Sequence, residues 1–481
     1  METLQVQKRS ERMILLLLCS VQFIVVLDTT VVNIALPAIQ EALHFSPQNL
    51  QWVSNAYLLM FAGFLLLGGR VADVFGRRKL FIAGLVLVSL ASLAAGLGLS
   101  DLELIGARVV QGLAAAVISP AALSILTVTF QGQARDRALG SFGAMAGIGA
   151  VAGLFLGGIL TQFLGWQWVF LINFPVGVVV ALLSLRYLDK SPGEIGGGFD
   201  LPGALTITAA LVLLVYTLVQ TTEQGWSSLM TLGSFGMTLI LFGLFIIIEL
   251  KNPAPMVDFA IFRYRRLTSA NLIALLFAAC VGSTLFLLTL YMQQVLGYSA
   301  LETGLALLPF EFATIFAATI SARLVTKYAV RVVISISLII FTAGLLVLSR
   351  VETDSSYLTI LLPGTILFGI GLTGSGIPLT IAAVSGVPHS WAGLASGLIN
   401  TTQQVGISVG LAIIATVAAA VKANNTGSVS GVEAMVRGYQ TGFLTAAGFS
   451  ATGVILALVL LREKKPAATL TQEPDLEEIS Q

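Results

Sequence analysis

Charged side chains are scarce in this chain of 481 residues, and their scarcity argues against a water-soluble protein. Asp, Glu, Lys and Arg make up 10% of the sequence, whereas hydrophobic residues make up 56%. A soluble domain carries about 25% charged residues, most of them on its surface. Too few are present to coat a protein of this size, so lipid is the expected solvent.

Residues suited to catalysis or metal binding are also few. The cysteines, Cys19 and Cys280, lie inside apolar blocks, which argues against a disulfide framework. The histidines, His44 and His389, belong to no metal or nucleophile pattern, and no G-x-x-x-x-G-K-[ST] phosphate loop occurs. We therefore predict no enzymatic activity, no metal and no cofactor. The net charge of +1 gives no indication of nucleic-acid binding.

Long apolar blocks separated by short polar joints fill most of the sequence. A helix that spans a bilayer needs about 20 mostly apolar residues. Fourteen such spans are expected, at 13–36, 50–69, 80–99, 103–128, 138–161, 167–186, 201–220, 229–249, 267–291, 304–323, 332–349, 357–383, 398–421 and 441–461. The blocks are too long for strands and lack their alternation. The predicted fold class is therefore an all-α membrane protein.

The positions of Lys and Arg predict the orientation of these spans. With fourteen spans, 21 of the 25 basic residues fall in joints on one side, three fall on the other, and Arg108 lies inside a span. Basic residues are enriched in cytoplasmic loops. Both termini are thus expected in the cytoplasm, in the plasma membrane and most simply the bacterial inner membrane.

A faint internal repeat suggests how the spans are grouped. The joint GGRVADVFGRRK (68–79) and the joint ISARLVTKYAVR (320–331) each place a basic cluster after a pair of spans. We predict a six-helix half over 1–190, a linker and inserted helical hairpin over 191–266, a second six-helix half over 267–465, and a disordered cytoplasmic tail over 466–481.

Several motifs in this order resemble the major facilitator superfamily, specifically its drug:proton antiporters with fourteen spans. The segment GRVADVFGRR (69–78) resembles the loop signature between the second and third helices, and LDTTVVNIALP (27–37) resembles the first-helix signature. LIGARVVQGLAAA (104–116) is similar to a fourth-helix motif associated with proton coupling. GWQWVFLINFPVG (165–177) and SGLINTTQQVGISVGLA (396–412) resemble segments of the sixth and penultimate helices. The resemblance implies two six-helix halves with an inserted hairpin.

Three charged residues within the spans are candidates for proton coupling. Asp28 lies about 15 residues into the first span, roughly 22 Å at 1.5 Å per residue. An ionised Asp at a helix centre costs about 2.5–3.5 kcal/mol, so it must pair, face water or take up a proton. Arg108 lies in the fourth-helix motif, and Glu311 follows Pro309 in the tenth span. The alternatives are a structural ion pair for Asp28, an interfacial arginine for Arg108, and an acid beside water without a coupling role for Glu311.

Two further sets of residues have predicted mechanical roles. A gate on the cytoplasmic side is expected in the 69–78 loop, formed by Gly69, Asp73, Gly76, Arg77 and Arg78. Close helix packing is expected along the fifth span at Gly149, Gly153, Gly157 and Gly158, with Gly143 and Gly147 before them. The alternative for the first set is that its arginines only mark the cytoplasmic side of the membrane. The alternative for the second set is that its glycines serve generic helix packing.

The substrate cavity is expected among polar and aromatic residues of several spans. The candidates are Asn33, Trp52, Tyr57, Gln111, Tyr291, Asn400, Gln403 and Gln404. The resemblance implies a proton-coupled secondary transporter that exports amphipathic drugs or a small metabolite by alternating access, and that works as a monomer. Leu154 stands where the antiporter motif of the fifth helix usually has proline. A proton symporter or lipid transporter therefore remains an alternative, as does a non-transporting membrane scaffold.

Overall fold

The computed structural model describes residues 2–46, 49–189, 200–253, 255–388, 391–425 and 429–461. Most of the predicted linker, at 191–199, and the predicted tail, at 466–481, lie outside these residues. Within the described ranges the chain is almost entirely helical and contains no strand.

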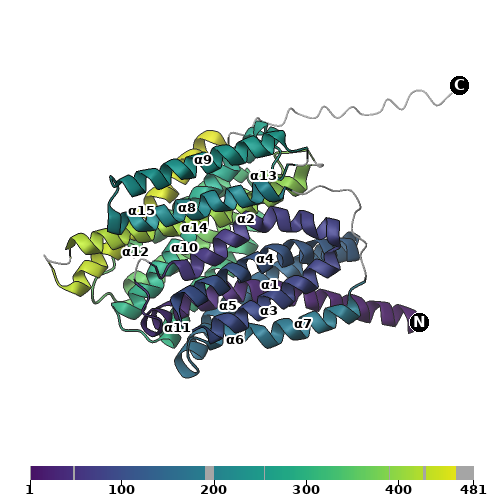
Figure 1. The fold of residues 1–481 in the computed structure, drawn as a ribbon, viewed down its shortest axis with the longest axis horizontal. Helices are drawn as coiled ribbons and strands as arrows, with labels where there is room; N and C mark the ends of the chain where they lie inside the picture. Colours follow the sequence, from purple (N-terminus) through teal and green to yellow (C-terminus); the bar gives the residue numbers. More distant parts are fainter. Residues whose placement is uncertain are drawn as a thin grey trace.

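The helices follow one another with short connections (Figure 1). They are α1 (Glu2–Ala42), α2 (Trp52–Phe75), α3 (Arg77–Leu97), α4 (Asp101–Thr129), α5 (Gly132–Phe163), α6 (Trp168–Leu171), α7 (Asn173–Tyr187), α8 (Leu201–Gln224), α9 (Leu229–Lys251), η1 (Phe259–Arg263), α10 (Arg265–Gln294), α11 (Ala300–Lys327), α12 (Val330–Leu348), η2 (Tyr357–Leu361), α13 (Leu362–Val384), α14 (Ala392–Asn425) and α15 (Gly431–Leu460).

The fourteen expected spans all fall on these helices. Thirteen stretches of the described chain are long and apolar enough to cross a membrane, and one of them, Trp168–Tyr187, joins α6 and α7. The fourteenth is α2, whose apolar stretch Trp52–Leu65 is shorter. Several helices, α1 and α15 among them, begin well before the predicted spans, because their polar ends continue the helix beyond the apolar block.

The helices form two six-helix halves with a hairpin between them in sequence. In the first half α1 packs on α5 and α2 packs on α4, and in the second α10 packs on α14 and α12 on α13. The hairpin of α8 and α9 lies along one side of the molecule (Figure 1), where α8 contacts both α2 and α14. The hairpin therefore bridges the two halves through a single helix.

The glycines of α5 allow two close helix contacts. A Cβ on Gly149 would lie 2.9 Å from the carbonyl oxygen of Phe23, and one on Gly157 would lie 3.1 Å from that of Val31, so both face α1. Gly153 faces α1 as well, whereas a Cβ on Gly158 would lie 2.7 Å from the Cα of Leu301 in α11. The i, i+4 glycines therefore join α5 to α1, and the extra glycine joins it to α11.

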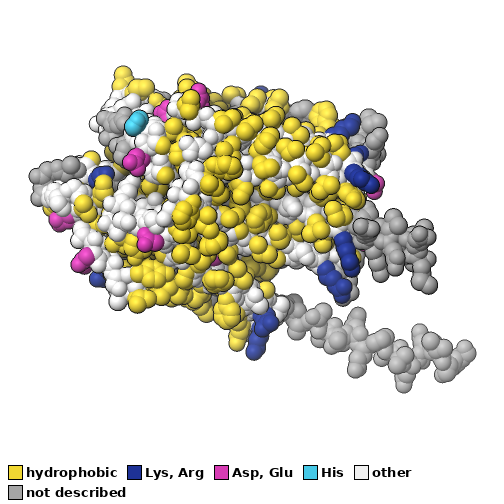
Figure 2. Space-filling model, turned by 90° about the horizontal axis from the view of Figure 1, so that it is seen from below, with side chains coloured by type: hydrophobic (Ala, Val, Ile, Leu, Met, Phe, Trp, Pro, Cys, Tyr) yellow, Lys and Arg dark blue, Asp and Glu magenta, His cyan; other side chains and the backbone are white. Residues whose placement is uncertain are grey.

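Basic side chains gather at one end of the molecule (Figure 2). This end, called the basic end below, includes the start of α3 at Arg77 and the end of α2, which Gly76 terminates with a φ of 98°. Asp and Glu side chains dot the opposite end in the same view. A broad band of hydrophobic side chains separates the two ends, as expected for a surface in contact with lipid.

Candidate functional site

A buried ion pair joins Asp28 of α1 to Arg108 of α4. The Arg108 guanidinium donates to the Asp28 carboxylate over 2.5 Å, and the two residues are only 3% and 1% exposed. Arg108 also donates to the carbonyl oxygen of Val53 over 2.9 Å and to Gln111 Oε1 over 2.9 Å. Its guanidinium carbon lies 4.5 Å from the centre of the Tyr57 ring. The cation is therefore held on several sides.

The Asp28 carboxylate accepts two further hydrogen bonds. Asn173 donates to Oδ1 over 2.9 Å and Gln111 donates to the same oxygen over 3.3 Å. Gln111 also donates to Ser92 Oγ over 2.8 Å. The network thus connects α1, α2, α3, α4 and α7 around one carboxylate.

Asn173 lies in the sixth span where α6 gives way to α7, and Ile172 between them keeps a helical conformation with φ of −59° and ψ of −31°. Pro175 has no backbone N–H, so it cannot donate to the carbonyl group of Leu171, and α6 ends there while α7 begins at Asn173. Neither Asn173 nor Ser92 was singled out from the sequence. The signal was present in the segment NFP, where a polar side chain precedes proline inside an apolar span.

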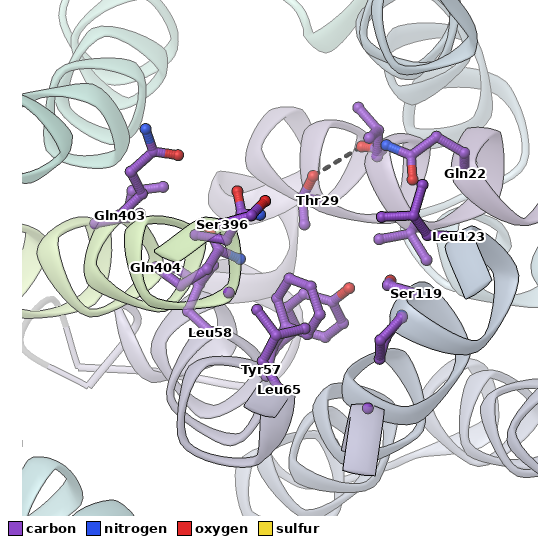
Figure 3. Close-up of a pocket in the computed structure, with 18 of the residues that line it drawn as sticks. Gln22, Thr29, Tyr57, Leu58, Leu65, Ser119, Leu123, Ser396, Gln403 and Gln404 are labelled. Carbon is purple, nitrogen blue, oxygen red and sulfur yellow. Dashed lines mark hydrogen bonds between the residues drawn. The ribbon is translucent and has the colours of Figure 1, made fainter. Parts of the chain in front are cut away.

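A large cavity lies next to the ion pair, between the two halves (Figure 3). Its volume is about 1070 Å³, slightly above the range of about 300–1,000 Å³ typical of small-molecule sites. Tyr57 points into its centre from α2, with Ser119 and Leu123 of α4 on one side and Gln403 and Gln404 of α14 on another. Both halves of the molecule therefore supply its wall.

The cavity wall is mixed in polarity but carries little charge. Among its described residues only Arg108 and Asp200 are charged, and the others are hydroxyl, amide and apolar side chains. Asp28 lies behind this wall and instead borders a separate void of about 10 Å³ that Tyr57 also lines. That volume is close to the smallest space that holds one water molecule. Arg108 and Tyr57 thus separate the Asp28 carboxylate from the main cavity.

The cavity extends toward the basic end and is closed at the opposite end. Its wall includes Gly69 near the end of α2, Asp200 at the start of α8 and Leu394 near the start of α14. At the other end the halves touch, since Gln293 of α10 donates to the carbonyl oxygen of Ile34 over 2.9 Å. There, a Cβ on Gly304 of α11 would lie 2.4 Å from the carbonyl oxygen of Leu154. In the described part of the chain, the cavity therefore reaches toward the basic end while the two halves are in contact at the other end.

Five of the eight predicted cavity residues lie on the wall, namely Asn33, Tyr57, Asn400, Gln403 and Gln404. The other three lie elsewhere. Gln111 is fully buried in the Asp28 network, and Tyr291 is buried in the core, where its hydroxyl donates to the carbonyl oxygen of Glu352. Trp52 packs on the cluster around Leu59. Being aromatic or polar within a span does not by itself place a residue on the wall.

Glu311 is buried in α11, away from the cavity wall, and is 6% exposed. Thr314 donates to its carboxylate over 3.4 Å. No basic residue in the described part of the chain forms an ion pair with it. Pro309 does not interrupt the helix, because α11 continues through it. Glu311 and the Asp28 pair are thus separate sites.

The predicted gate residues lie at the basic end. Gly69 is on the cavity wall, Gly76 separates α2 from α3, and Arg78 donates to the carbonyl oxygen of Leu185 at the end of α7. Arg77 begins α3. The Asp73 side chain lies outside the described residues. The predicted loop is therefore mostly helix, since α2 continues to Phe75 and Gly76 alone separates it from α3. The described part of this segment connects three helix ends beside the cavity opening.

Comparison with known proteins identifies the family. A family model of the Major Facilitator Superfamily matches residues 18–411. The chain belongs to the Major Facilitator Superfamily. Among its relatives is a cephamycin export protein of Amycolatopsis lactamdurans, 37% identical over 97% of this chain and 95% of that protein. A puromycin resistance protein of Streptomyces alboniger is 36% identical over 95% of this chain and 92% of that protein.

Solved structures of the superfamily share the fold. A bacterial homologue of the human lysosomal transporter Spinster, in an inward-facing and unoccupied conformation, superimposes with a TM-score of 0.69 over 94% of this chain and 97% of that chain, at 14% identity. The nucleoside transporter NupG gives a TM-score of 0.68 at 12% identity, over 93% of this chain and 100% of that chain. The motif resemblance is therefore confirmed, and the protein is a multi-pass membrane transporter of small molecules.

Proposed function

We propose that the protein exports amphipathic drugs or a small metabolite in exchange for protons, by alternating access. The observation that carries the proposal is the buried Asp28–Arg108 pair, in which Arg108 itself lines a large cavity. Relatives named for cephamycin export and puromycin resistance support export as its direction. Arg108 keeps its charge, so within the pair a proton can be exchanged only at Asp28.

The arrangement suggests how proton and substrate are linked. Arg108 belongs both to the ion pair and to the cavity wall, so a change in cavity contents acts directly on the cation that pairs with Asp28. An opposite charge at this distance favours the charged carboxylate, whereas burial favours the neutral one. A substrate or water molecule that draws Arg108 away would favour protonation of Asp28.

The composition of the wall supports an amphipathic substrate without strong charge. Hydroxyl and amide groups such as Asn33, Asn400 and Gln403 can accept or donate hydrogen bonds, while the apolar stretches take up a hydrophobic body. Proton entry at roughly 150 mV supplies about 3.5 kcal/mol per charge, equivalent to about a 300-fold concentration ratio. One proton per neutral substrate is thus sufficient for useful export.

We further propose that the basic end is cytoplasmic, in the bacterial inner membrane, with both termini on that side. The grouping of Lys and Arg at that end supports this orientation (Figure 2). The proposed halves are 1–190 and 267–465, and the monomer is the proposed functional unit. A reporter fused to either terminus should be active in the cytoplasm, and an external reporter at either end would contradict the orientation.

The 69–78 loop is the proposed cytoplasmic gate, since it joins helix ends at the opening of the cavity. Asp73→Ala should slow transport and leave substrate binding nearly unchanged, because the loop lies at the far end from the ion pair. Equilibrium binding and initial transport rates of the purified variant separate these effects. Weakened binding with a normal transport rate would argue against a gate.

The export proposal is tested by dye efflux from bacterial cells that express the protein. Cells should expel a fluorescent amphipathic dye faster than control cells, and an uncoupler that collapses the proton gradient should remove the difference. Cells that express Arg108→Ala at equal membrane abundance serve as the matched control. Dye accumulation in place of expulsion would favour symport, and no difference for any dye of a broad panel would contradict drug export.

A further inference from the structure

Two buried carboxylates meet at the basic end of the cavity, apart from the Asp28 network. Asp200 precedes α8 and is 2% exposed, and Glu249 lies in the last turn of α9 and is 3% exposed. Asp200 thus lies at the beginning of the inserted hairpin and Glu249 lies near its end. Asp200 also lies on the cavity wall, together with Pro255 and Met256 of the segment that follows α9. Neither residue was singled out from the sequence.

Each carboxylate uses one oxygen and leaves the other without a partner. Asp200 Oδ1 accepts from the Gly203 N–H over 2.7 Å as the N-cap of α8, and Glu249 Oε2 accepts from the Val257 N–H over 3.0 Å. Asp200 Oδ2 and Glu249 Oε1 are buried without a hydrogen-bond partner in the described part of the chain. A buried carboxylate oxygen without a hydrogen-bond partner destabilises the folded protein, so a hydrogen-bond donor is expected to bind at this point.

The unpartnered oxygens converge on the same point. A Cβ on Gly203 would lie 2.4 Å from Asp200 Oδ2 and 2.9 Å from Glu249 Oε1. The missing side chain of Gly203 therefore leaves room for the two oxygens to face each other. Two like charges this close, on side chains that are both buried, cannot both be ionised without a large free-energy cost.

The charged residues on the elements around the pair are mostly exposed. Along α8, α9 and the segment that follows, the described ones are Lys251, Asp258, Arg263 of η1 and Arg265 of α10, all exposed, and the half-buried Arg266. On α14, Lys422 lies at the far end of the helix from Leu394. On α2, the side chains of Arg70 and Asp73 lie outside the described residues. Glu249 and Asp200 form no ion pair with a described basic residue.

We propose that Asp200 and Glu249 form a second proton-binding site, in which one proton is shared between the two carboxyl groups at the basic end of the cavity. The proton lies between Asp200 Oδ2 and Glu249 Oε1, where it supplies the missing hydrogen bond and removes one of the two charges. Because Asp200 lies on the cavity wall, this proton exchanges with water in the cavity. The inference concerns protonation alone and does not require export.

Infrared titration of the purified full-length protein in lipid nanodiscs tests the shared proton. The carbonyl stretch of a protonated carboxyl group is measured while the pH is raised, in the wild type and in Asp200→Asn and Glu249→Gln. Asn still caps α8 and Gln still accepts from Val257, so both variants keep the local backbone contacts. In each variant the carbonyl band of the protonated carboxyl group should be absent, or should disappear at a pH about one unit or more below that of the wild type. This shift is expected because the remaining carboxyl group no longer interacts with a second one.

Asp258→Asn is the matched control, because Asp258 is an exposed carboxylate that caps the neighbouring η1. Its spectrum should match that of the wild type above the range in which exposed carboxylates titrate. An unchanged band in both pair variants would overturn the proposal, as would retention of the wild-type midpoint by the single remaining carboxyl group. The measurement uses neither substrate nor gradient, so its failure is distinct from a failure of the export proposal.

If neither variant folds, a carbodiimide that reacts with protonated carboxyl groups decides the matter on the wild type alone. Mass spectrometry should locate the adduct on Asp200 or Glu249 near neutral pH, with a yield that falls as the pH is raised. Exposed Asp258 should remain unmodified under the same conditions. Equal, negligible labelling of all three residues would overturn the shared proton.

Discussion

Replacement of Asp28 by asparagine removes the charge that balances Arg108, with almost no change in shape. The introduced amide can still accept one hydrogen bond from Arg108 through its oxygen. Its NH₂ group then faces Asn173 and Gln111, which donate to the carboxylate in the wild type. An amide flip of Asn173 can repair one of these contacts. Arg108 keeps the carbonyl oxygen of Val53, Gln111 Oε1 and the Tyr57 ring.

The stability cost follows from these contacts. Removal of one partner of a buried ion pair typically costs about 3–5 kcal/mol, because the other charge is left uncompensated. The remaining hydrogen bonds and the ring contact of Arg108 place Asp28→Asn at the lower end, about 3 kcal/mol. Asp28→Ala should cost more, since it also removes the acceptor of Asn173 and one of the three acceptors of the Arg108 guanidinium. Thermal unfolding of both variants in detergent should show this order.

The functional cost should be larger than the stability cost. The asparagine side chain cannot release a proton, so the variant is fixed in the equivalent of the protonated form. Uphill export should be abolished, with the substrate ratio falling from as much as about 300-fold toward equality. Downhill exchange of substrate can survive, and Asp28→Glu should keep part of the activity. The assay is substrate-induced proton movement in proteoliposomes, recorded with a pH-sensitive dye.

Asp101→Asn provides the matched control, because Asp101 is an exposed carboxylate at the start of the same helix as Arg108. It should move protons at the wild-type rate. Proton movement at the wild-type rate by Asp28→Asn would refute the reasoning. Asp28 would then be a structural partner of Arg108, and Glu311 would become the leading candidate for the proton site.

Substitutions at Tyr57, Gly158 and Glu311 test other parts of the site. Tyr57→Phe keeps the ring over Arg108 and should retain most transport, whereas Tyr57→Leu loses a desolvated cation–π contact of about 2 kcal/mol and should lose coupling; dye efflux compares them. Gly158→Val places a side chain against the backbone of α11 and should hold the closed end open. A cysteine reporter on the outer side should then become more reactive. Gly143→Val is the control, because a Cβ at Gly143 has no neighbour within 4 Å, and it should leave this reactivity unchanged. Glu311→Gln should reduce proton movement less than Asp28→Asn, and a complete block would reverse that ranking.

The fold could be predicted because lipid imposes a simple rule on sequence. Each span needs about 20 apolar residues, so the count of fourteen follows from the blocks themselves. Asp28 and Arg108 were equally visible, since a charge inside an apolar block requires a partner. The direct contact between Asp28 and Arg108 depends on the tertiary structure. However, only a few charged residues lie inside the spans, so each had few possible partners. The sequence therefore limited the possible pairings to a small number.

Other parts of the site depend on geometry that no single segment contains. Tyr57 and Tyr291 are both tyrosines in apolar spans, yet one lines the cavity and the other is buried in the core. The difference lies in which face of each helix meets the opposite half. Asp200 and Glu249 stood at span ends, where a polar residue is ordinary. Only the return of α9 beside the start of α8 brings the two carboxylates together.

Three hydrogen bonds cross the closed end of the molecule, beside the packing of α5 on α11. Across it, Gln293 donates to Ile34, Gln294 donates to Gln40 and the Leu301 N–H donates to Gln162, over 2.9, 2.9 and 3.3 Å. At about 0.5–1.5 kcal/mol each, these hydrogen bonds contribute a few kcal/mol in total. One proton supplies about 3.5 kcal/mol at roughly 150 mV, which is of the same size. The hydrogen-bonded part of the closure is therefore of a size that the proposed exchange of one proton can break, whereas the glycine contacts of α5 with α11 must separate as a packed surface.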